Sequence, residues 1–434
     1  MAEPLGDPRK AVVHAALSDV GLRRANNQDT FAVALAGDTG EWRRRGHLFM
    51  VADGMGAHAA GELASKMACE TVPHTYRKQP DGSPATVLKS AISAANRSIH
   101  DRGETNAEFQ GMGTTSSVLV LLPHAAVVAH VGDSRVYRVR DGKIEQLTFD
   151  HSLVWEMMAA GQMPRGEVAS FIPKNIITRS LGPRRDVQID LEGPFPLSAG
   201  DTFLLCSDGL SGQVTDEEIG AILSALTPEE AVRALIDMAN LRGGPDNITA
   251  VVARVENVPS DGAIDSNVPT STDTPSTPLA QVLWVLTALG MLGALVLIAS
   301  GNLPGALASG LLAAVAAVVA MVINLVKSPA ASSAGPEGPF GTGPHTEHDC
   351  APNPERVAGL CQMAQQLREA AKEEHWTLDW TKFNEYSEHA QAALGKGDFV
   401  EGVRQYALAI SFMMSEIRHQ PSRKDQRDRS VLDM

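Results

Sequence analysis

The sequence predicts a domain of mixed α and β structure over residues 10–255, a hairpin of two apolar segments at 279–326, and a small all-α region at 354–419. Three observations predict this division. Strand-like and helix-like segments alternate along the first part, charge-free runs form the second, and amphipathic helix patterns fill the third. Residues 256–278 and 327–353 are rich in Pro, Ser, Thr or Gly, which predicts linkers between the parts.

The first part contains apolar or β-branched segments bounded by Gly, Pro or Asp, which is the pattern of β-strands. These segments are "HLFMVA" (47–52), "TTSSVLVLL" (114–122), "AAVVAHVG" (125–132), "DTFLLCS" (201–207) and "NITAVVARV" (247–255). Asp141-Gly142 lies between two further short runs and predicts a hairpin turn. Amphipathic patterns predict helices at about 60–77, 84–100, 215–225 and 228–241.

The second part consists of residues 279–300 and 306–326, two runs without a charged side chain that are separated by "GNLPG". Each run has about 20 residues, the length that crosses the hydrocarbon core of a bilayer. A pair of buried core helices is the alternative, but two such runs around a short turn favour a transmembrane hairpin. Both flanks would then lie on one side of the membrane. Lys327 is the only base nearby, so loop charge does not set the orientation.

The third part contains "FNEYSEHAQAALGKGDFVEGVRQYALAISFMM" (383–414), which predicts two amphipathic helices joined by "GKGDF". This pair is similar to a tetratricopeptide unit and would serve as a protein-interaction region. A single unit of that kind cannot bury a solenoid core. A plain helical hairpin or short bundle therefore stays open as the other interpretation.

Composition excludes several classes of function. The formal net charge of −14, with no compensating basic patch, argues against a nucleic-acid-binding protein. The four cysteines form no C-x-x-C pair, so the sequence predicts neither a zinc knuckle nor a disulfide framework. The first residues carry acids and prolines without a long apolar stretch and do not resemble a signal peptide.

Carboxylates occur at the ends of several predicted strands. Asp53, Asp133 and Asp208 each follow a strand, and Asp246 precedes one. Any single Asp-Gly pair is typical of a turn. A buried charge is costly unless it is paired or binds a metal, however, and oxygen ligands projected from rigid elements suit a hard cation. Their recurrence in one domain therefore predicts a metal site.

A base and an acid lie close together in "SDVGLRRANNQDTF" (18–31), at Arg24 and Asp29. The planar guanidinium of arginine can bind two oxygens of a phosphate at once. Arg24 is therefore a candidate phosphate ligand, and a surface arginine is the alternative.

Short motifs follow one another in a fixed order from Gly21 to Thr249. They are G-x-x-R-x-x-N-Q-D (Gly21, Arg24, Asn27, Gln28, Asp29), D-G-M-G-A-H (Asp53 to His58), G-T-T (Gly113 to Thr115), G-D-S-R (Gly132 to Arg135), S-D-G-L (Ser207 to Leu210) and D-N-x-T (Asp246, Asn247, Thr249). "DHSLV" (150–154) and "NIITRSLG" (175–182) also match. Together they resemble the metal-dependent, type-2C (PPM) family of protein serine/threonine phosphatases in its bacterial form, over about residues 10–255.

The resemblance implies an α+β fold, an αββα sandwich of two packed antiparallel sheets with helices outside. It implies that Asp53 bridges two Mg²⁺ or Mn²⁺ ions, that the Gly54 carbonyl binds one of them, and that Asp208 and Asp246 complete the other site. Asp29 and Asp133 belong to the same metal-binding set. The ions would generate a bridging hydroxide that attacks the phosphorus, while Arg24 holds the phosphoryl oxygens. His58 is the motif candidate for a general acid, and a water on the metal is the alternative.

Three positions depart from the family pattern. Gln28 stands in place of a glutamate, Ala57 in place of a glycine, and Gly212 in place of an aspartate that helps Asp133 hold a third ion. We therefore expect two ions, with a third weak or absent. The ligands Asp53, Asp208 and Asp246 are retained, which favours an active enzyme.

These observations lead to a membrane-anchored phosphatase of phosphoserine and phosphothreonine as the predicted function. We expect a multi-pass protein of the inner membrane with its catalytic domain and helical tail in the cytoplasm. Its partners would be phosphoproteins, namely serine/threonine kinases and their substrates. The alternative is a phosphatase-like scaffold that binds phosphoproteins without turnover. A transporter built on the hairpin is disfavoured, because the two runs contain no ionisable residue.

Overall fold

The computed structural model describes residues 7–56, 59–162, 176–259, 300, 339–376 and 378–418. Residues 1–262 and 337–434 belong to one compact unit, and the fold below is the fold of its described residues. The described part of the chain before residue 260 and the part after residue 338 are thus packed as a single body.

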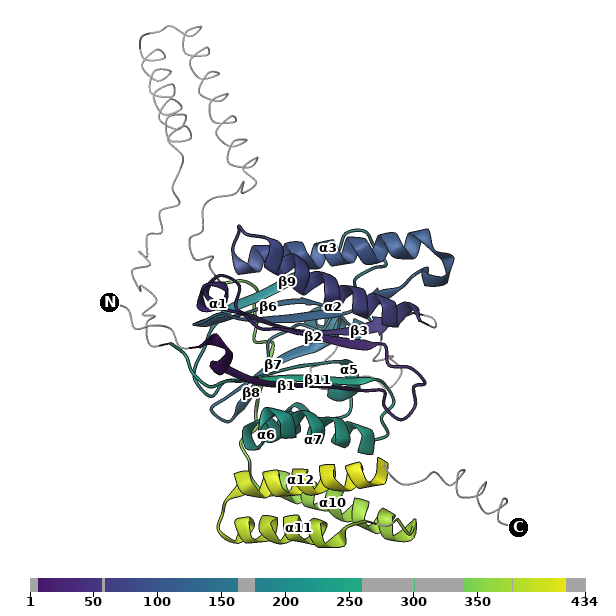
Figure 1. Ribbon diagram of the computed structural model, residues 1–434, viewed down its shortest axis with the longest axis vertical. Helices are drawn as coiled ribbons and strands as arrows, with labels where there is room; N and C mark the ends of the chain where they lie inside the picture. The colour runs from purple at the N-terminus through teal and green to yellow at the C-terminus, as the bar shows by residue number, and fades with distance from the viewer. Residues whose placement is uncertain are drawn as a thin grey trace, which may run out of the picture. The chain divides into compact units, whose positions relative to one another are not determined.

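Two antiparallel β-sheets form the centre of this unit (Figure 1). In the described residues the first sheet has the order β1 (Val12–Asp19), β11 (Ile248–Val255), β10 (Thr202–Cys206), β7 (Arg135–Arg140), β8 (Lys143–Gln146) and β12 (Thr346–Asp349). The second has the order β2 (Asp29–Ala34), β3 (His47–Met55), β5 (Ser116–Leu121), β6 (Ala125–Val131) and β9 (Asp190–Pro196), with β4 (Gly113–Thr114) paired to β3.

Helices cover the outer face of each sheet, as Figure 1 shows. The second sheet is covered by α2 (Ala60–Lys78) and α3 (Pro84–Thr105), and the first by α6 (Asp216–Ala225) and α7 (Pro228–Leu241). Capping boxes at Thr215 and Thr227 begin α6 and α7, because each threonine pairs with a glutamate three residues later. The predicted αββα sandwich is therefore confirmed.

The remaining described helices before residue 260 are short. They are the 3-10 helices η1 (Pro8–Lys10) and η2 (Ala107–Phe109), and the α-helices α1 (Thr39–Arg45), α4 (Leu153–Ala159) and α5 (Asp208–Ser211). The β7–β8 hairpin turns at Asp141 and Gly142, which both have positive φ, at 50° and 74°. That left-handed geometry is what an Asp-Gly turn requires.

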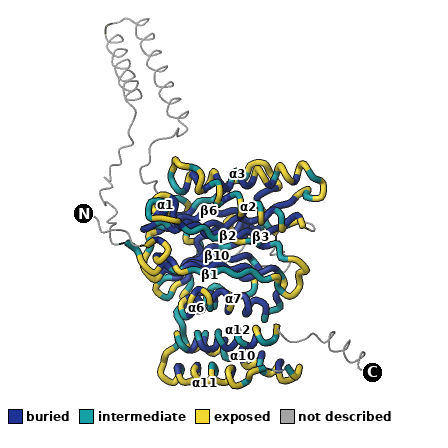
Figure 2. Tube along the Cα trace, in the orientation of Figure 1, coloured by how far each residue is buried: buried dark blue, intermediate teal, exposed yellow. Residues whose placement is uncertain are grey.

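The buried core follows these layers, and Figure 2 shows the sheets as mostly buried. Between the sheets lie large apolar side chains such as Phe49, Leu119, Phe203 and Val251. A second cluster joins the other face of β3 and β5 to α2 and α3. A third cluster joins β10 and β11 to α6 and α7, and it continues into the C-terminal helices.

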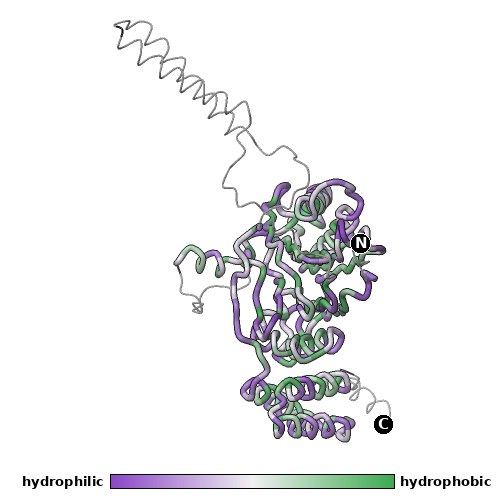
Figure 3. Tube along the Cα trace, turned by 90° about the vertical axis from the view of Figure 1, so that its left-hand side faces the viewer, coloured by the Kyte–Doolittle hydropathy of each residue, from purple (hydrophilic) through white to green (hydrophobic). Residues whose placement is uncertain are grey.

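The chain after residue 338 adds a strand and a helical layer to this sandwich. Strand β12 lies inside the stretch 327–353 that was predicted as a linker, and it pairs with β8. The helices α10 (Pro354–Glu373), α11 (Trp380–Gly395) and α12 (Phe399–Arg418) follow, and α12 packs on α6 and α7. Figure 3 shows that hydrophobic and hydrophilic residues alternate along these helices, as expected for helices with one buried face.

The structure contradicts the membrane part of the predicted fold class. The proposed spans, 279–300 and 306–326, lie outside the described residues. Among the described residues no helix is both long and apolar enough to cross a bilayer. The longest, α3, has 22 residues, but it carries charged side chains such as Lys89, Arg97 and Asp101. The transmembrane hairpin and the multi-pass membrane location are therefore corrected, and the fold class is the α+β sandwich with its C-terminal strand and helices.

Candidate metal centre and active site

The strand register brings the predicted carboxylates to one edge of the sandwich. Asp29 begins β2 and lies opposite Asp53 of β3. In the other sheet, Cys206 at the end of β10 pairs with both Ala250 of β11 and Arg135 of β7. Asp208 follows that end of β10, while Asp246 and Asp133 precede the paired ends of β11 and β7. Because the strands are antiparallel, these ends meet at the same place.

Hydroxyl groups hold Asp29 in the interior. Ser207 Oγ donates to Asp29 Oδ2 at 2.7 Å and Thr249 Oγ1 donates to the same oxygen at 2.8 Å. The backbone around Asp53 is fixed as well, because its N–H donates to Thr115 Oγ1 and its carbonyl accepts from Thr114 Oγ1. The motifs G-T-T, S-D-G-L and D-N-x-T contain these hydroxyl residues, but the sequence alone assigned them no role.

Burial and mutual repulsion raise the pKa values of these carboxyls. Burial is the largest cause at Asp53, whose pKa lies well above its ordinary value, and Asp29, Asp208 and Asp133 add to it. Burial also raises the pKa of Asp29 to about 6 and that of Asp133 to about 8. The pKa of Asp208 is raised by burial and by the nearby charge of Asp246. A nearby cation would reverse this effect, because it favours the charged form of each carboxyl.

Several of these carboxyls have an oxygen that lacks a partner. Among the described residues, Asp29 Oδ1, Asp133 Oδ1 and Asp208 Oδ1 are buried without a hydrogen-bond partner. Oxygen donors of this kind suit Mg²⁺ and Mn²⁺, which are hard cations. The set of donors therefore fits either ion.

The side chains do not by themselves enclose an ion. Within the described ranges no three His, Cys, Asp or Glu side chains form a group that could hold a metal. Mg²⁺ is commonly bound through one or two carboxylates and keeps several waters. An ion at this edge would therefore need further oxygen donors, such as a backbone carbonyl or water.

Gly54 is closely surrounded by backbone. A Cβ at this position would lie 2.1 Å from the Gly61 carbonyl oxygen and 2.5 Å from that of Gln28. The Gly54 N–H donates to the Gln28 carbonyl, which ties β3 to the residue before Asp29. The side chain of Gln28 donates to the Gly56 carbonyl at 3.5 Å. A glutamate could not make that contact unless protonated, so the departure at Gln28 changes both charge and bonding.

Arg24 lies at the exposed side of the centre. Its Nη2 donates to Asp246 Oδ2 at 2.8 Å, and its side chain is 52% exposed. This hydrogen bond is the largest cause of the raised pKa of Arg24, so the guanidinium is charged. Arg24 is therefore brought to the centre as predicted, with exposed N–H groups that can meet a ligand.

The loop that carries Arg24 is fixed by the residues around Asp246. Asn247 accepts from the Gln28 N–H and donates to the carbonyls of Val20 and Asn26. Gly21, with a φ of 77°, passes so near Asp246 that a Cβ would lie 2.1 Å from its carbonyl oxygen. Asn247 and Gly21 thus position the arginine, a role that their motifs did not reveal.

A cavity of about 340 Å³ opens beside Asp133 and Asp208, and Gly212 is part of its lining. Arg135 also lines it and binds Asp150 through Nε and Nη2, at 2.9 and 2.8 Å from Oδ2. Gly212 offers no carboxylate toward Asp133, as expected from the sequence. His58 and Ala57 lie outside the described residues.

Comparison with known proteins places this geometry in context. The family model of Protein phosphatase 2C matches residues 23–242. The chain is 38% identical over 242 residues to Protein phosphatase PhpP of Streptococcus pneumoniae, a match that covers 54% of this chain and 94% of PhpP. It is 37% identical over 243 residues to Serine/threonine protein phosphatase PstP of Mycobacterium tuberculosis, covering 56% of this chain and 45% of PstP.

A solved structure is similar as well. The crystal structure of the Mycobacterium tuberculosis serine/threonine phosphatase PstP/Ppp aligns with a TM-score of 0.51 at 36% identity. The alignment covers 57% of this chain and 99% of that one. The family-model match spans residues 23–242, a range that includes Asp29, Asp53, Asp133 and Asp208.

Proposed function

Because this chain belongs to the protein phosphatase 2C family and is a metal-dependent serine/threonine protein phosphatase, we propose that its carboxylate edge is the catalytic centre. The substrates in this proposal are phosphoserine and phosphothreonine residues of proteins. The observation that carries it is the meeting of Asp29, Asp53, Asp208 and Asp246 beside an exposed arginine. Mutual repulsion of buried carboxyls and a charged guanidinium suit a site for cations and phosphate.

In this proposal Asp53, the Gly54 carbonyl, Asp208 and Asp246 hold two Mg²⁺ or Mn²⁺ ions, with Asp29 and Asp133 beside them. When bound, the ions would supply Lewis-acid chemistry and lower the pKa of a bridging water toward neutrality, which provides a hydroxide nucleophile. A third ion would bind weakly, because Gly212 has no carboxylate to share it with Asp133.

Arg24 orients the phosphoryl group. Its guanidinium keeps one N–H on Asp246, and the others are free to face two phosphoryl oxygens. The pairing with Asp246 restricts the arginine before substrate arrives, which lowers the entropy lost on binding. Asp29 is held by Ser207 and Thr249, so these hydroxyls keep the carboxylate edge in place during turnover.

In this proposal the proton for the leaving serine or threonine comes from His58 or from a water. The helical region 354–419 remains a proposed protein-interaction region, through surfaces that it does not use against α6 and α7. The proposed partners of the whole protein are phosphoproteins, including serine/threonine kinases and their substrates.

The substrate class can be tested with the metal-stripped full chain. Matched peptides carrying phosphoserine, phosphothreonine or phosphotyrosine are incubated with Mn²⁺ or Mg²⁺, and released phosphate is measured. We expect release from the first two peptides and little from the third. Binding of phosphopeptides without any release would favour the scaffold instead.

A further inference from the structure

A second pocket, of about 380 Å³, lies next to the cavity of the metal centre. One wall consists of Phe149, on the loop after β8, and of Trp155 and Met158, on helix α4. The other wall is residues 345–348, at the start of β12. Those residues lie outside the range 23–242 that matches the phosphatase family, so this wall belongs to the C-terminal part of the chain.

The segment 340–349 is fixed to both sheets. Phe340 exchanges backbone hydrogen bonds with Gly193 of β9, and Glu192 accepts from the Gly343 N–H at 2.8 Å. On the other side, β12 pairs with β8 from Thr346 opposite Gln146 to Asp349 opposite Lys143. A segment held by backbone bonds at both ends makes a rigid wall.

Aromatic rings shape the interior of the pocket. The Phe149 ring meets the Trp155 ring edge-on at 5.2 Å between centroids, and meets His345 at 5.6 Å. Arg135 lies over the Trp155 ring at 5.7 Å, so this ring also touches the residue that binds Asp150. Aromatic walls with a methionine favour an apolar or aromatic occupant.

The two cavities are neighbours with shared walls. Trp155 and Met158 line both the pocket and the cavity that contains Asp133 and Asp208. A ligand that lies along this cleft can therefore reach from the metal centre into the pocket. A phosphorylated peptide is such a ligand, because its flanking side chains extend from the phosphorylated residue.

The ionisable side chains that line the pocket already have partners. Glu347 binds Lys143 at 2.6 Å, His348 lies 3.2 Å from Glu217, and His345 lies 3.1 Å from Glu192. An incoming charged side chain would have to compete with these contacts. A neutral apolar side chain would leave these contacts intact. It would lose little free energy on desolvation and would gain from burying its apolar surface.

We propose that this pocket is a specificity site for the protein substrate, binding an apolar or aromatic side chain near the phosphoserine or phosphothreonine. The inference rests on the proposed function, and it assigns to the C-terminal segment 345–348 a direct part in choosing substrates. The pocket lies beside the reacting group and does not contain it, so it would bind the substrate and the transition state equally. Its effect should therefore appear mainly in KM.

The test uses the full chain with Mn²⁺ and a set of polar phosphothreonine peptides that differ only in the position of one phenylalanine. We expect one position to raise kcat/KM by roughly tenfold, as burial of an aromatic side chain allows, chiefly through KM. Trp155→Ala should remove this preference and Trp155→Phe should keep most of it. Ala159→Trp, which fills the pocket without removing a wall, should also remove it.

His74→Ala is the matched control, because His74 is an exposed histidine on α2, and it should keep the preference. Equal rates for every phenylalanine position in the wild-type protein would overturn the specificity site while leaving the phosphatase intact. A preference that survives in both Trp155→Ala and Ala159→Trp would overturn it too. No phosphate release from any peptide would overturn the proposed function, and the specificity site with it.

Discussion

Arg24 of the first loop and Asp246 of the loop before β11 are joined by a hydrogen bond of 2.8 Å across 222 residues of sequence. The arginine predicted to bind phosphate thus contacts a carboxylate predicted to bind metal. The positive charge offsets part of the repulsion among the carboxylates, and the carboxylate directs the guanidinium toward the centre. Metal binding and phosphate binding are therefore expected to influence each other at this pair.

Arg24→Ala should lower kcat/KM for a phosphothreonine peptide on the order of a hundredfold, because it removes a charged donor to the phosphoryl oxygens. Thermal stability should change little, since the pair is largely exposed. Steady-state kinetics measure the first effect and thermal unfolding the second. Arg23→Ala is the control, because Arg23 is exposed beside it. An equal loss in both variants would show that Arg24 has no special role.

Asp237 of α7 gives the folded protein a pH dependence. Burial raises its pKa from 3.8 to about 6, while Arg418 of α12 opposes the rise. Folding therefore favours the protonated form, and stability falls as pH rises from about 4 to about 6. Asp237→Asn does not undergo this loss, so its stability relative to wild type should increase by about 2 kcal/mol between pH 4 and pH 7. Denaturant unfolding at both pH values measures the difference.

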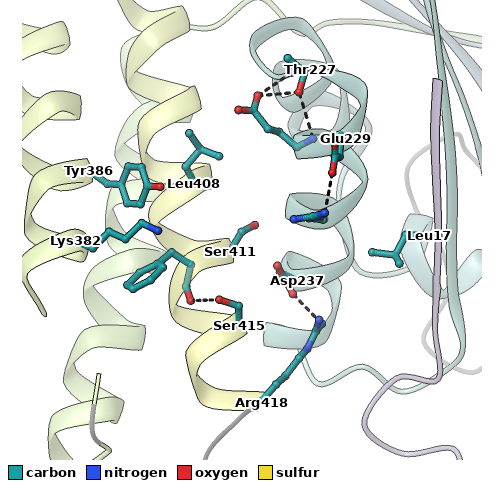
Figure 4. A pocket seen from close by; sticks show the side chains of 13 residues that line it. Leu17, Thr227, Glu229, Asp237, Lys382, Tyr386, Leu408, Ser411, Ser415 and Arg418 are labelled. Atoms are coloured by element: carbon teal, nitrogen blue, oxygen red, sulfur yellow. Dashed lines mark hydrogen bonds and ion pairs between the residues drawn. The ribbon is translucent and has the colours of Figure 1, made fainter. Parts of the chain in front are cut away.

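The partner of Asp237 provides a second check. Figure 4 shows Arg418 pointing at Asp237, and Arg418 Nη2 donates to Asp237 Oδ1 at 2.8 Å. Both side chains line a cavity of about 650 Å³. Arg418→Gln removes the opposing charge, so the pKa of Asp237 should rise further. The stability lost with rising pH should then be larger than in wild type. A stability difference for Asp237→Asn that does not vary with pH would contradict this account.

The C-terminal helices should be part of the cooperative core of the phosphatase. Ile410 of α12 is fully buried in the same cluster as Ile222 of α6 and Leu235 of α7. Ile410→Ala should cost about 2 to 5 kcal/mol, because it leaves a cavity there. In the wild type and in this variant, activity and the circular-dichroism signal of the helices should be lost together on heating. Val400→Ala on the same helix is the control, since Val400 is 47% exposed and its loss should cost under about 0.5 kcal/mol.

Two separate melting transitions in the wild-type chain, with activity following only the first, would contradict a shared core. Such a result would mean that α12 folds as an independent unit.

Much of the centre was predictable because its residues stand in local patterns. Asp53 and Asp208 follow apolar strands, and Asp246 precedes one. The pattern therefore indicated that these carboxylates lie at the ends of strands. Strand register then brings them together, and the family resemblance indicated that they share one metal site. The hydroxyls of Ser207 and Thr249 carry no comparable local signal, because a hydroxyl beside a strand is common and its partner lies far away in sequence.

The C-terminal part was harder to predict. Strand β12 stands in a stretch rich in Pro and Gly, and it pairs with β8 about 200 residues earlier, so its strand character depends on an open sheet edge. The amphipathic pattern of 383–414 indicated one buried face on each helix, but a pattern cannot say what covers that face. Here α6 and α7 cover part of it. The apolar runs at 279–326 were interpreted from their length, their lack of charge and the short turn between them, and no helix of the described residues could span a membrane.

The measurement that tests the central claim most directly is phosphate release from a phosphothreonine peptide by the metal-stripped full chain as Mn²⁺ is added back, for wild type and Asp53→Asn. The account predicts that wild-type activity starts near zero and saturates with Mn²⁺. Asp53→Asn should stay near zero, although its metal-free form should melt at the same or a higher temperature because repulsion in the carboxylate cluster is reduced. Full activity in excess chelator, or an Asp53→Asn variant that matches wild type, would contradict it.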